Sequence, residues 1–325
     1  MIVVDADVLG RARTGDETYV SNLLRELPRV APELQLAAVT RHPELVPDGV
    51  EPIVLSTRFQ EVRMALTLPR LLRRLRPELA HFQHALPLGY GGAAVVTVHD
   101  LSFESDAAGM GPVDRLVFRT VVPRAVRRAD HVIAVSERTR DDLVSRYGVP
   151  PAKVTVTPHG VDPVFAPGDG RDGYLLFVGA IHRRKDPLAA LAAARAAGLP
   201  LVVAGPETDR ELAARLRAGG ADLRGYVEKV ELAELYRRAA AVILPSRFEG
   251  FGLPVLEAMA SGTPVVISDD PALREVAGDA AAASVQDALE NRERLAAAGI
   301  ARARGFSWEE TARRTADVYR RVLGR

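Results

Sequence analysis

Residues 241–262 read AVILPSRFEGFGLPVLEAMASG, and this stretch decides the fold class that the sequence predicts. It opens with a short, continuously apolar run, which is typical of a strand buried on both faces of a parallel sheet. A loop with two glycines follows, and Pro254 then stands where a helix would begin, a position that proline suits. A buried strand, a loop and a helix in this order form the repeating unit of an α/β sheet.

The same alternation continues along the whole chain. Short β-branched runs recur, with apolar residues at helical spacing between them, as in residues 16–29 and 307–322. About ten strands are too many for one doubly wound sheet, and a chain of 325 residues is too long for one ordinary core. Pro, Gly and Asp cluster at residues 163–173, between two strand signals. The sequence therefore predicts two α/β domains, residues 1–168 and 169–306, followed by a last helix at 307–325.

Composition excludes several classes of protein. The 43 basic and 42 acidic residues nearly cancel, so a nucleic-acid partner is not expected. The absence of cysteine excludes disulfides, thiolate metal sites and cysteine nucleophiles, and it fits a cytoplasmic protein. No apolar run approaches the roughly 18 residues of a membrane span, and the N-terminus resembles a first strand more than a signal peptide.

Two glutamates, Glu249 and Glu257, lie in the otherwise apolar stretch with seven residues between them. Free backbone amides at a helix N-terminus favour an anion, most often a phosphate, and Gly250 and Gly252 allow the backbone to approach a ligand closely. The two carboxylates would then flank a diphosphate and bind hydroxyl groups on either side of it. The alternative is that Glu257 is a favourable first-turn carboxylate and Glu249 a loop charge.

Polar residues follow other predicted strands. The basic run RRK at residues 183–185 could hold the same diphosphate, although such a run is also common in solvated turns. His99 ends the strand AAVVTV, where it would face a cleft between the two domains. The pair His81 and His84 has no nearby acidic third ligand, so no metal site is expected there.

Residues 68–79, LPRLLRRLRPEL, place arginines beside leucines. A helix with one core face and one solvated face explains this pattern. The alternative is an interfacial helix that lies on a membrane surface.

The motif FEGFGLPVLEAMASGTPVV resembles the E-x7-E signature of retaining nucleotide-sugar glycosyltransferases of family four, also described as glycosyl transferases group 1. The segments TGDETYVSNLL, TVHDLSFE, LFVGAIHRRKDP and ALREVAGDAA have counterparts in the same order, and the branch resembles mannosyltransferase B. This resemblance implies the GT-B fold, an α/β fold of two facing Rossmann-like domains with a deep interdomain cleft. The N-terminal domain would bind the acceptor and the C-terminal domain the nucleotide-sugar donor, and helix 307–325 would cross back to the first domain.

The resemblance also implies residue roles. Glu249 would contact the donor sugar, Glu257 would hold the ribose hydroxyls, and Arg184 and Lys185 would stabilise the leaving diphosphate. The catalytic group implied in this way is Glu249, His99, Lys185 and Arg184. The donor-binding group is Gly15, Gly179, Tyr226, Gly250, Phe251, Gly252, Leu253 and Glu257.

The implied activity is retaining transfer of a hexose, with mannose from GDP-mannose as the expected donor sugar, to a saccharide or lipid-linked acceptor, without a cofactor or metal. One departure concerns Glu17, because the family often has glycine at its place. An anionic side chain beside a diphosphate would repel it, so Glu17 either turns away or meets the acceptor. A non-catalytic sugar-nucleotide-binding protein and a nucleotide-sugar epimerase of the same fold are alternatives. The expected location is the cytoplasm, with peripheral contact to the inner face of the membrane if helix 68–79 is interfacial.

Overall fold

The structure is a computed structural model of the 325-residue chain, and it describes residues 1–11, 15–105, 111–170 and 172–325. The predicted loop between Gly10 and Gly15 therefore lies partly outside the described residues. The chain forms two compact units, and each is described by itself. Unit 1 comprises Met1–Glu104, Gly111–Gly160 and Trp308–Arg325, and unit 2 is built on Val161–Ser307.

The division between the units comes at Gly160, before the boundary expected after residue 168. The segment that follows Gly160 is fastened to unit 2 by Arg237. Its guanidinium donates to the carbonyl oxygens of Val164 at 2.8 Å and Ala166 at 2.9 Å. The segment after Gly160 therefore belongs to unit 2, although its Pro, Gly and Asp residues are typical of a linker.

Unit 1 contains a seven-stranded parallel sheet with the order β3-β2-β1-β4-β5-β6-β7. Its strands are β1 (Ile2–Asp5), β2 (Leu36–Thr40), β3 (Val50–Val54), β4 (Leu79–Gln83), β5 (Ala94–Val98), β6 (His131–Ala134) and β7 (Val154–Val156). Its helices are α1 (Gly15–Val30), α2 (Gln60–Val62), a π-helical segment (Arg63–Thr67), α3 (Leu68–Leu75), α4 (Ser102–Ser105), α5 (Pro112–Arg128), α6 (Glu137–Tyr147) and α14 (Trp308–Leu323), with 3₁₀ turns at Pro43–Leu45 and Pro151–Lys153.

The strand order of unit 1 reverses at β1, which pairs with β2 on one side and β4 on the other. Val3, for example, lies opposite Ala37 and Ala80. In an open parallel sheet the carboxyl ends of the strands beside such a reversal form a crevice that binds ligands. The loops after β1, β4 and β5 are therefore the part of unit 1 in which functional side chains are expected.

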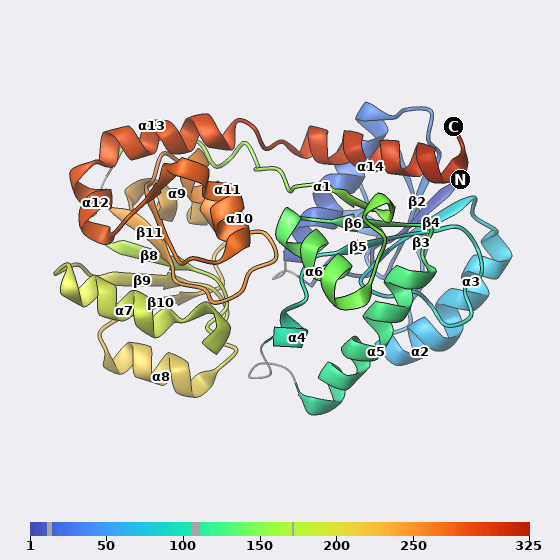
Figure 1. The fold of residues 1–325 in the computed structure, drawn as a ribbon, viewed down its shortest axis with the longest axis horizontal. Coiled ribbons are helices and arrows are strands. Elements are labelled where there is room, and N and C mark those ends of the chain that lie inside the picture. The colour runs from blue at the N-terminus through green and yellow to red at the C-terminus, as the bar shows by residue number, and fades with distance from the viewer. Residues whose placement is uncertain (12–14, 106–110, 171) are drawn as a thin grey trace. The chain divides into compact units, whose positions relative to one another are not determined.

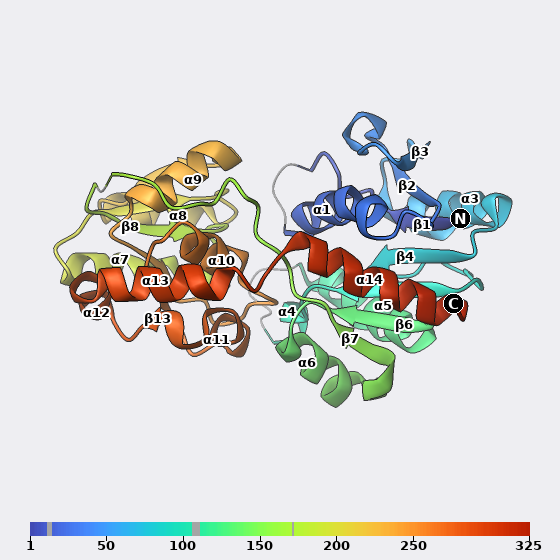
Figure 2. The same ribbon diagram turned by 90° about the horizontal axis from the view of Figure 1, so that it is seen from above.

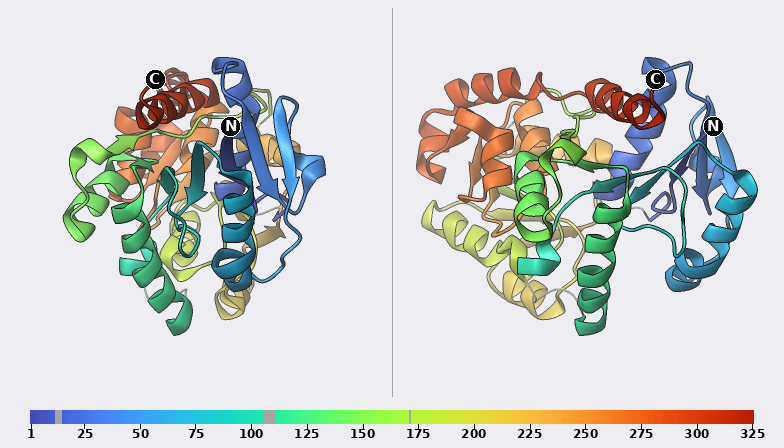
Figure 3. Two further views of the ribbon diagram at one scale, coloured as in Figure 1. Left: turned by 90° about the vertical axis from the view of Figure 1, so that its right-hand side faces the viewer. Right: turned by 45° about the vertical axis from the view of Figure 1, so that its right-hand side comes forward.

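The last helix, α14, belongs to unit 1 and packs against α1 (Figure 2). Figure 3 shows it on the opposite side of the sheet from α5. A buried polar chain fastens α14 to the strands: His81 bonds the Tyr319 hydroxyl through Nδ1 at 2.6 Å and the Thr97 hydroxyl through Nε2 at 2.7 Å. Tyr19 of α1 adds a bond to Thr97 at 3.1 Å. Burial lowers the pKa of His81 to about 3, so its ring is neutral at pH 7.

Unit 2 contains a six-stranded parallel sheet with the order β10-β9-β8-β11-β12-β13. Its strands are β8 (Leu175–Val178), β9 (Leu201–Ala204), β10 (Asp222–Gly225), β11 (Ala241–Leu244), β12 (Val265–Ile267) and β13 (Ala281–Ala282). Its helices are α7 (Pro187–Ala196), α8 (Arg210–Ala218), α9 (Lys229–Arg238), α10 (Leu253–Ala260), α11 (Pro271–Ala277), α12 (Val285–Glu290) and α13 (Arg292–Ala303), with 3₁₀ turns at Arg183–Lys185 and Gly278–Ala280.

The sheet of unit 2 is covered on both faces, as its continuously apolar strands require. Figure 1 shows α7 and α8 on the opposite side of this sheet from α9 and α10. Phe177 of β8, Val203 of β9 and Ile243 of β11 form one hydrophobic cluster with Leu191 of α7 and Leu216 of α8. The strand order reverses between β8 and β11, so the loops after these two strands lie at the ligand-binding edge of unit 2.

Candidate functional site

Charged residues of the loops after β8 and β11 form one cluster at the ligand-binding edge of unit 2. The Lys185 ammonium donates to Glu249 Oε1 at 2.5 Å, and an Arg184 guanidinium nitrogen lies 3.6 Å from Glu249 Oε2. Arg184 also donates to the carbonyl oxygen of Phe248 at 2.5 Å. The Lys185 and Glu249 side chains are only 14% and 9% exposed, so these charges are held in a largely dry environment. Two cations and one carboxylate at this edge suit a ligand that carries both negative charge and hydroxyl groups.

Asp270 positions the backbone that carries Glu249. Its Oδ2 accepts a hydrogen bond from the Glu249 amide at 3.2 Å, while its Oδ1 accepts from the amides of Ala272 and Leu273 at 3.0 and 3.2 Å. Asp270 is thus the N-cap of α11 and also a support for the loop after β11. Asp270 is not among the predicted site residues, although aspartate directly before Pro271 is a helix-start signal.

The helix that follows this loop begins one residue earlier than predicted. Leu253 is the first residue of α10, and Pro254 is the second. Gly252 precedes the helix with φ +113°, and a Cβ there would lie 2.7 Å from Leu273 Cδ2. Phe251 is 4% exposed and packs against the Phe306 ring with centroids 6.0 Å apart, so its side chain belongs to the core. Any contact of Phe251 with a ligand would therefore come from its backbone.

Glu257 lies one turn inside α10. Its Oε2 accepts a hydrogen bond from the Tyr236 hydroxyl of α9 at 2.8 Å. Burial raises the pKa of Glu257 to about 7, while the Tyr236 hydroxyl and Lys229 lower it and Asp162 raises it. The Lys229 ammonium and Asp162 are themselves paired at 2.7 Å. Tyr236 was not expected from the sequence, because only the packing of α9 on α10 places it next to Glu257.

Glycines end three neighbouring strands at the same edge. Gly179 follows β8 with φ +144°, Gly205 follows β9 with φ +149°, and Gly225 ends β10 with φ +65°. A Cβ on Gly205 would lie 2.1 Å from the carbonyl oxygen of Gly179, and one on Gly179 would lie 3.7 Å from Lys185 Cε. These positions therefore require glycine for conformation and close approach. Tyr226, predicted to bind the donor, follows Gly225 and is 44% exposed.

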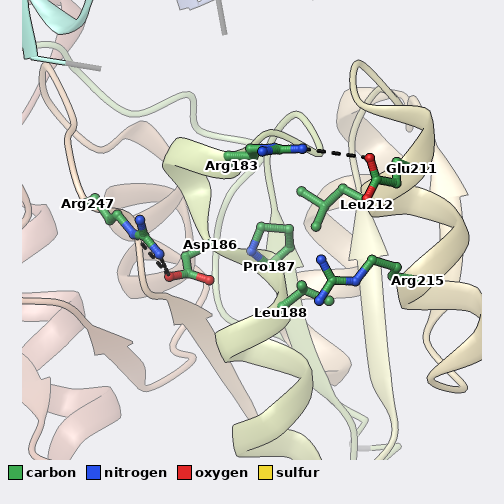
Figure 4. A pocket seen from close by; sticks show the side chains of 8 residues that line it. All are labelled: Arg183, Asp186, Pro187, Leu188, Glu211, Leu212, Arg215 and Arg247. Atoms are coloured by element: carbon green, nitrogen blue, oxygen red, sulfur yellow. Dashed lines mark hydrogen bonds and ion pairs between the residues drawn. The ribbon is translucent and has the colours of Figure 1, made fainter. Parts of the chain in front are cut away.

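The basic run at residues 183–185 divides between two places. Arg184 and Lys185 join Glu249, whereas Arg183 faces Asp209 at 3.4 Å and Glu211 at 3.8 Å. Arg183 lines a separate pocket of about 310 Å³ (Figure 4). The pocket is also lined by Asp186, Pro187, Leu188, Glu211, Leu212, Arg215 and Arg247. Its carboxylates pair with its arginines, as Arg247 does with Asp186 at 2.9 Å, so the charges of this pocket are largely compensated.

In unit 1, α1 begins at Gly15, and its first turn carries two carboxylates with different partners. Glu17 Oε1 accepts a hydrogen bond from the Gly10 amide at 2.8 Å. Asp16 instead faces two histidines: its carboxylate oxygens lie 3.7 Å from His99 Nδ1 and 3.9 Å from His84 Nε2. Glu17 was expected either to turn away from a diphosphate or to meet the acceptor, and its carboxylate bonds the backbone of the loop after β1.

The histidines beside Asp16 lie at the ends of β4 and β5. His99 is 8% exposed, and its Nε2 bonds Gln83 Oε1 at 2.9 Å. Burial lowers the pKa of His99 to about 4, with Asp16 acting in the opposite direction, so the ring is neutral at pH 7. Within the described residues, Asp16, His84 and His99 are the one His, Asp or Glu group with metal-like spacing, with ligand atoms within 4.8 Å of one another. His81 is not part of this group, because both of its ring nitrogens are hydrogen-bonded in the core.

The predicted site residues therefore fall into two groups. In unit 2 the structure places Arg184, Lys185 and Glu249 in contact and the other predicted donor residues on the loops and helix beside them. In unit 1 it places His99 near the start of α1, where Gly15 lies. The residues that sequence reasoning missed are Asp270, Tyr236, Asp16 and the contact of His84 with this group.

Helix α3 has the core face and the solvated face that its sequence favours. Leu71 and Leu72 are 9% and 2% exposed, whereas Arg70, Arg73 and Arg74 are exposed. Leu68, Leu71 and Leu72 thus belong to the core of unit 1, and Leu75 is partly buried. No helix within the described part of the chain is long and apolar enough to span a membrane.

Comparison with known proteins gives the same assignment over both units. Glycosyltransferase Family 4 matches residues 13–165, and Glycosyl transferases group 1 matches residues 166–301. O-antigen chain mannosyltransferase B of Escherichia coli is 28% identical over 267 residues, covering 70% of each chain. D-inositol 3-phosphate glycosyltransferase of Kribbella flavida is 33% identical over 291 residues, covering 74% of this chain and 67% of that protein.

The fold is shared with solved glycosyltransferases. Sucrose-phosphate synthase from Thermosynechococcus elongatus superposes with a TM-score of 0.74 at 20% identity, and the match covers 99% of each chain. The GT-B fold is established by the two Rossmann-like units with parallel sheets together with this structural likeness. The chain belongs to glycosyltransferase family 4, with a glycosyl transferases group 1 region in its second half.

Proposed function

We propose that the protein is a retaining hexosyltransferase that moves mannose from GDP-mannose to a saccharide or lipid-linked acceptor. The observation that carries the proposal is the cluster that Lys185 and Arg184 of the loop after β8 form with Glu249 of the loop after β11. It combines fixed positive charge with a carboxylate that can accept hydrogen bonds from sugar hydroxyls. The N-terminal end of α10 adds the positive end of its helix dipole. Pro254 has no N–H, and the amides of Val255 and Leu256 donate to the Gly252 carbonyl oxygen.

The two cations would stabilise the diphosphate as it leaves. Negative charge develops on its bridging oxygen when the bond to the sugar breaks, and cations already in place lower the energy of that state. We therefore propose that transfer needs neither a cofactor nor a metal, because Arg184 and Lys185 supply the charge that a divalent cation would supply. Glu257 would accept hydrogen bonds from the ribose hydroxyls, with Tyr236 holding its carboxylate in place.

Neither glutamate is assigned as a nucleophile or general base. Glu249 is paired with Lys185, and in the proposed retaining mechanism the departing phosphate takes the acceptor proton on the same face of the sugar. The Escherichia coli relative is named an O-antigen chain mannosyltransferase, and this name supports both mannose as the donor sugar and a saccharide as the acceptor. Tyr226, exposed after β10, would lie beside the guanine base.

The test is donor hydrolysis and transfer with purified protein and radiolabelled GDP-mannose. Lys185→Ala and Glu249→Gln should each lower kcat/KM by about 100-fold, the size expected when a charge-stabilising group is removed. Arg183→Gln is the matched control: it removes a neighbouring cation that faces the other pocket, and it should stay within about twofold of the wild type. Unchanged activity in both site variants would refute the assignment. Mannose epimers without an acceptor would support an epimerase, and binding without turnover a non-catalytic protein.

We also propose that the enzyme works in the cytoplasm and contacts the membrane peripherally through the exposed arginines of α3. The attraction would be electrostatic, because Leu68, Leu71 and Leu72 of this helix are buried and Leu75 is partly buried. Arg70→Glu combined with Arg73→Glu should abolish co-sedimentation with vesicles that contain phosphatidylglycerol. Absence of vesicle binding by the wild-type protein would end this proposal without affecting the assignment of the donor site.

A further inference from the structure

We propose that the pocket lined by Arg215 and Arg247 in unit 2 binds a small phosphate monoester, and that this ligand regulates the donor site beside it. The pocket has a volume of about 310 Å³, and none of the proposed donor residues lines it. Binding to this pocket goes beyond the proposed function, whereas the regulatory step rests on the proposed donor site.

The floor of the pocket is apolar and its rim is cationic. Pro187 and Leu212 are buried and Leu188 is partly buried, whereas Arg215 and Arg247 are exposed. Figure 4 shows the two arginines reaching the pocket from opposite sides, one from α8 and the other from the loop after β11. Ligand pockets in proteins commonly measure about 300–1,000 Å³ and combine an apolar lining with a few polar groups. This pocket therefore suits a small ligand that has a ring-shaped or apolar body and an anionic group.

Arg215 is the cation that the carboxylates of the pocket leave available. The Arg183 guanidinium faces two carboxylates, and Arg247 pairs with Asp186. Arg215 forms no ion pair with any residue that the structure describes, and its guanidinium extends towards Leu188 (Figure 4). A guanidinium has five N–H donors in one plane and binds phosphate oxygens bidentately. Arg215 therefore provides the main anchor for an oxyanion.

Arg247 supplies further donors for the same ligand. Its Nε and Nη2 both donate to one oxygen of Asp186, Oδ2, at 3.2 and 2.9 Å. Its other terminal nitrogen, Nη1, makes no hydrogen bond within the described part of the chain. A phosphate monoester has three terminal oxygens, so it can bond Arg215 bidentately and still accept from Arg247. A carboxylate has only two oxygens, and Arg215 would occupy both, so the pocket favours a phosphate monoester.

The pocket carboxylates leave room for this anion. Asp186 remains neutralised by Arg247 through a single oxygen. The Glu211 side chain is 74% exposed and lies 3.8 Å from Arg183, so it can turn into solvent when an anion binds. The Asp209 carboxylate does not line the pocket, and it accepts a hydrogen bond from the Leu212 amide at the start of α8.

The pocket and the donor cluster share their two loops. The Lys185–Glu249 pair joins these loops in the donor cluster, and the pair that Asp186 forms with Arg247 joins them again at the pocket. The Arg247 amide also donates to the carbonyl oxygen of Arg184 at 2.8 Å. An anion that holds the Arg247 side chain against α8 therefore restricts the loop that carries Glu249.

This shared backbone couples the two ligands. A donor nucleotide would have to order the same loops, so a phosphate monoester that has already ordered them lowers the entropy cost of donor binding. Coupling between two binding sites is reciprocal, so the nucleotide must strengthen binding to the pocket by the same factor. We expect a factor of about five or more, which is the lower end of typical coupling between sites.

The experiment titrates the full-length enzyme with phenyl phosphate by calorimetry, with benzoate as the matched carboxylate. The wild type should bind phenyl phosphate about tenfold or more tightly than benzoate. Arg215→Gln should weaken phenyl phosphate binding about tenfold or more, the loss expected for hydrogen bonds to a charged group. Arg217→Gln is the control, because it removes a cation of the same helix that pairs with Glu207, and it should match the wild type. Lys185→Ala should retain phenyl phosphate binding.

The regulatory step has its own measurements. Saturating phenyl phosphate should tighten GDP binding about fivefold or more in the wild type, and GDP should tighten phenyl phosphate binding equally. Hydrogen exchange at the Arg247 amide should slow when phenyl phosphate binds. Arg215→Gln should remove both effects and leave GDP binding in the absence of phenyl phosphate within about twofold of the wild type.

Several results would overturn the proposal. Binding that Lys185→Ala abolishes and Arg215→Gln retains would place the phosphate in the donor cluster, and equal losses in Arg215→Gln and Arg217→Gln would reduce it to general surface charge. No binding of phenyl phosphate at millimolar concentration would refute the site, and benzoate binding of equal strength would refute the preference for phosphate. Unchanged GDP affinity would refute the regulation. Failure of the proposed function is distinguishable, because GDP would then not bind, whereas phenyl phosphate binding and its loss in Arg215→Gln need no donor.

Discussion

Lys185 Nζ lies 2.5 Å from Glu249 Oε1 and connects the loops that follow β8 and β11. These two strands are neighbours at the reversal of the sheet, so the ion pair fixes both sides of the proposed donor site to each other. Since both side chains are mostly buried, neither charge can be satisfied by solvent alone. The pair therefore contributes to the stability of unit 2 as well as to the chemistry proposed for it.

We expect strong coupling between Lys185 and Glu249 in a double-mutant cycle. Lys185→Ala leaves a mostly buried carboxylate whose remaining cation, Arg184, is 3.6 Å away, and Glu249→Gln leaves an ammonium without its carboxylate. The loss of unfolding free energy in the double variant should be smaller than the sum of the losses in the two single variants. The difference, measured by urea unfolding, should be a coupling energy of about 1–3 kcal/mol. Additive losses would show that the pair does not stabilise the free enzyme.

Donor affinity should depend on pH through Glu257. Its pKa of about 7 is raised by burial, and ribose hydroxyls donate to the ionised carboxylate, so nucleotide binding should strengthen as pH rises from 6 to 8. The stability of the free protein should change in the opposite sense. Because the folded pKa lies above the ordinary 4.5, this contribution to stability is fully present below pH 4.5 and is lost as pH rises through about 7.

The matched variants for this prediction are Glu257→Gln and Tyr236→Phe. Glu257→Gln should remove the pH dependence of GDP binding, measured by calorimetry. Tyr236→Phe removes a hydrogen bond that lowers the pKa of Glu257, so it should move the midpoint of the binding curve to higher pH. The charged neighbours Lys229 and Asp162 are unchanged in both variants. A wild-type binding curve that is flat between pH 6 and 8 would contradict the assigned role.

The sequence predicted the architecture well where a local pattern carries it. Apolar runs of four or more residues located strands such as β8 and β11, but β4, β10 and β13 were not among the predicted runs. In β4, His81 interrupts the apolar residues. β10 reads DLRG with alternating exposure, and β13 is only two residues long, so neither has the continuous apolar run of a buried strand. The α10 helix was placed to within one residue, because glycine and proline fix the backbone at its start.

The candidate site was predictable only in part. The spacing of Glu249 and Glu257 was visible in the sequence, but Tyr236 and Asp16 acquire their partners through tertiary packing. Tyr236 lies 21 residues from Glu257, and Asp16 of α1 meets histidines that directly follow two strands of the sheet. The sequence also gave no reason to separate Arg183 from Arg184, since the opposite directions of neighbouring side chains depend on the turn that carries them.

Gly252 should tolerate no side chain. Its φ of +113° strains any other residue, and a Cβ would lie 2.7 Å from Leu273 Cδ2. Gly252→Ala should therefore lower the unfolding free energy by about 1–3 kcal/mol and weaken GDP-mannose binding, because the first turn of α10 would shift. Gly198→Ala is the control, since Gly198 also has positive φ, +67°, but has open space at its Cβ. Equal destabilisation would assign the effect to φ alone, and unaltered donor binding by Gly252→Ala would separate this turn from the site.

The buried bond between His81 and Tyr319 should decide how firmly α14 is held in unit 1. Tyr319→Phe removes the hydroxyl that bonds His81 Nδ1 at 2.6 Å and leaves a fully buried ring nitrogen without that partner. The unfolding free energy at pH 7 should fall by about 1–3 kcal/mol in urea titrations. Arg313→Gln, which breaks exposed ion pairs on the same helix, should lower the unfolding free energy much less, because solvent screens exposed pairs.

The pH dependence of stability tests the same bond through protonation of His81. The pKa of His81 is lowered from 6.5 to about 3, so the stabilisation from its neutral, bonded form is present above pH 6.5 and is lost as pH falls towards 3. His81→Gln should reduce this acid sensitivity, because the amide can retain hydrogen bonds in the core without titrating. If Tyr319→Phe is no less stable than Arg313→Gln at pH 7, and His81→Gln leaves the acid sensitivity unchanged, then apolar packing alone holds α14 against α1.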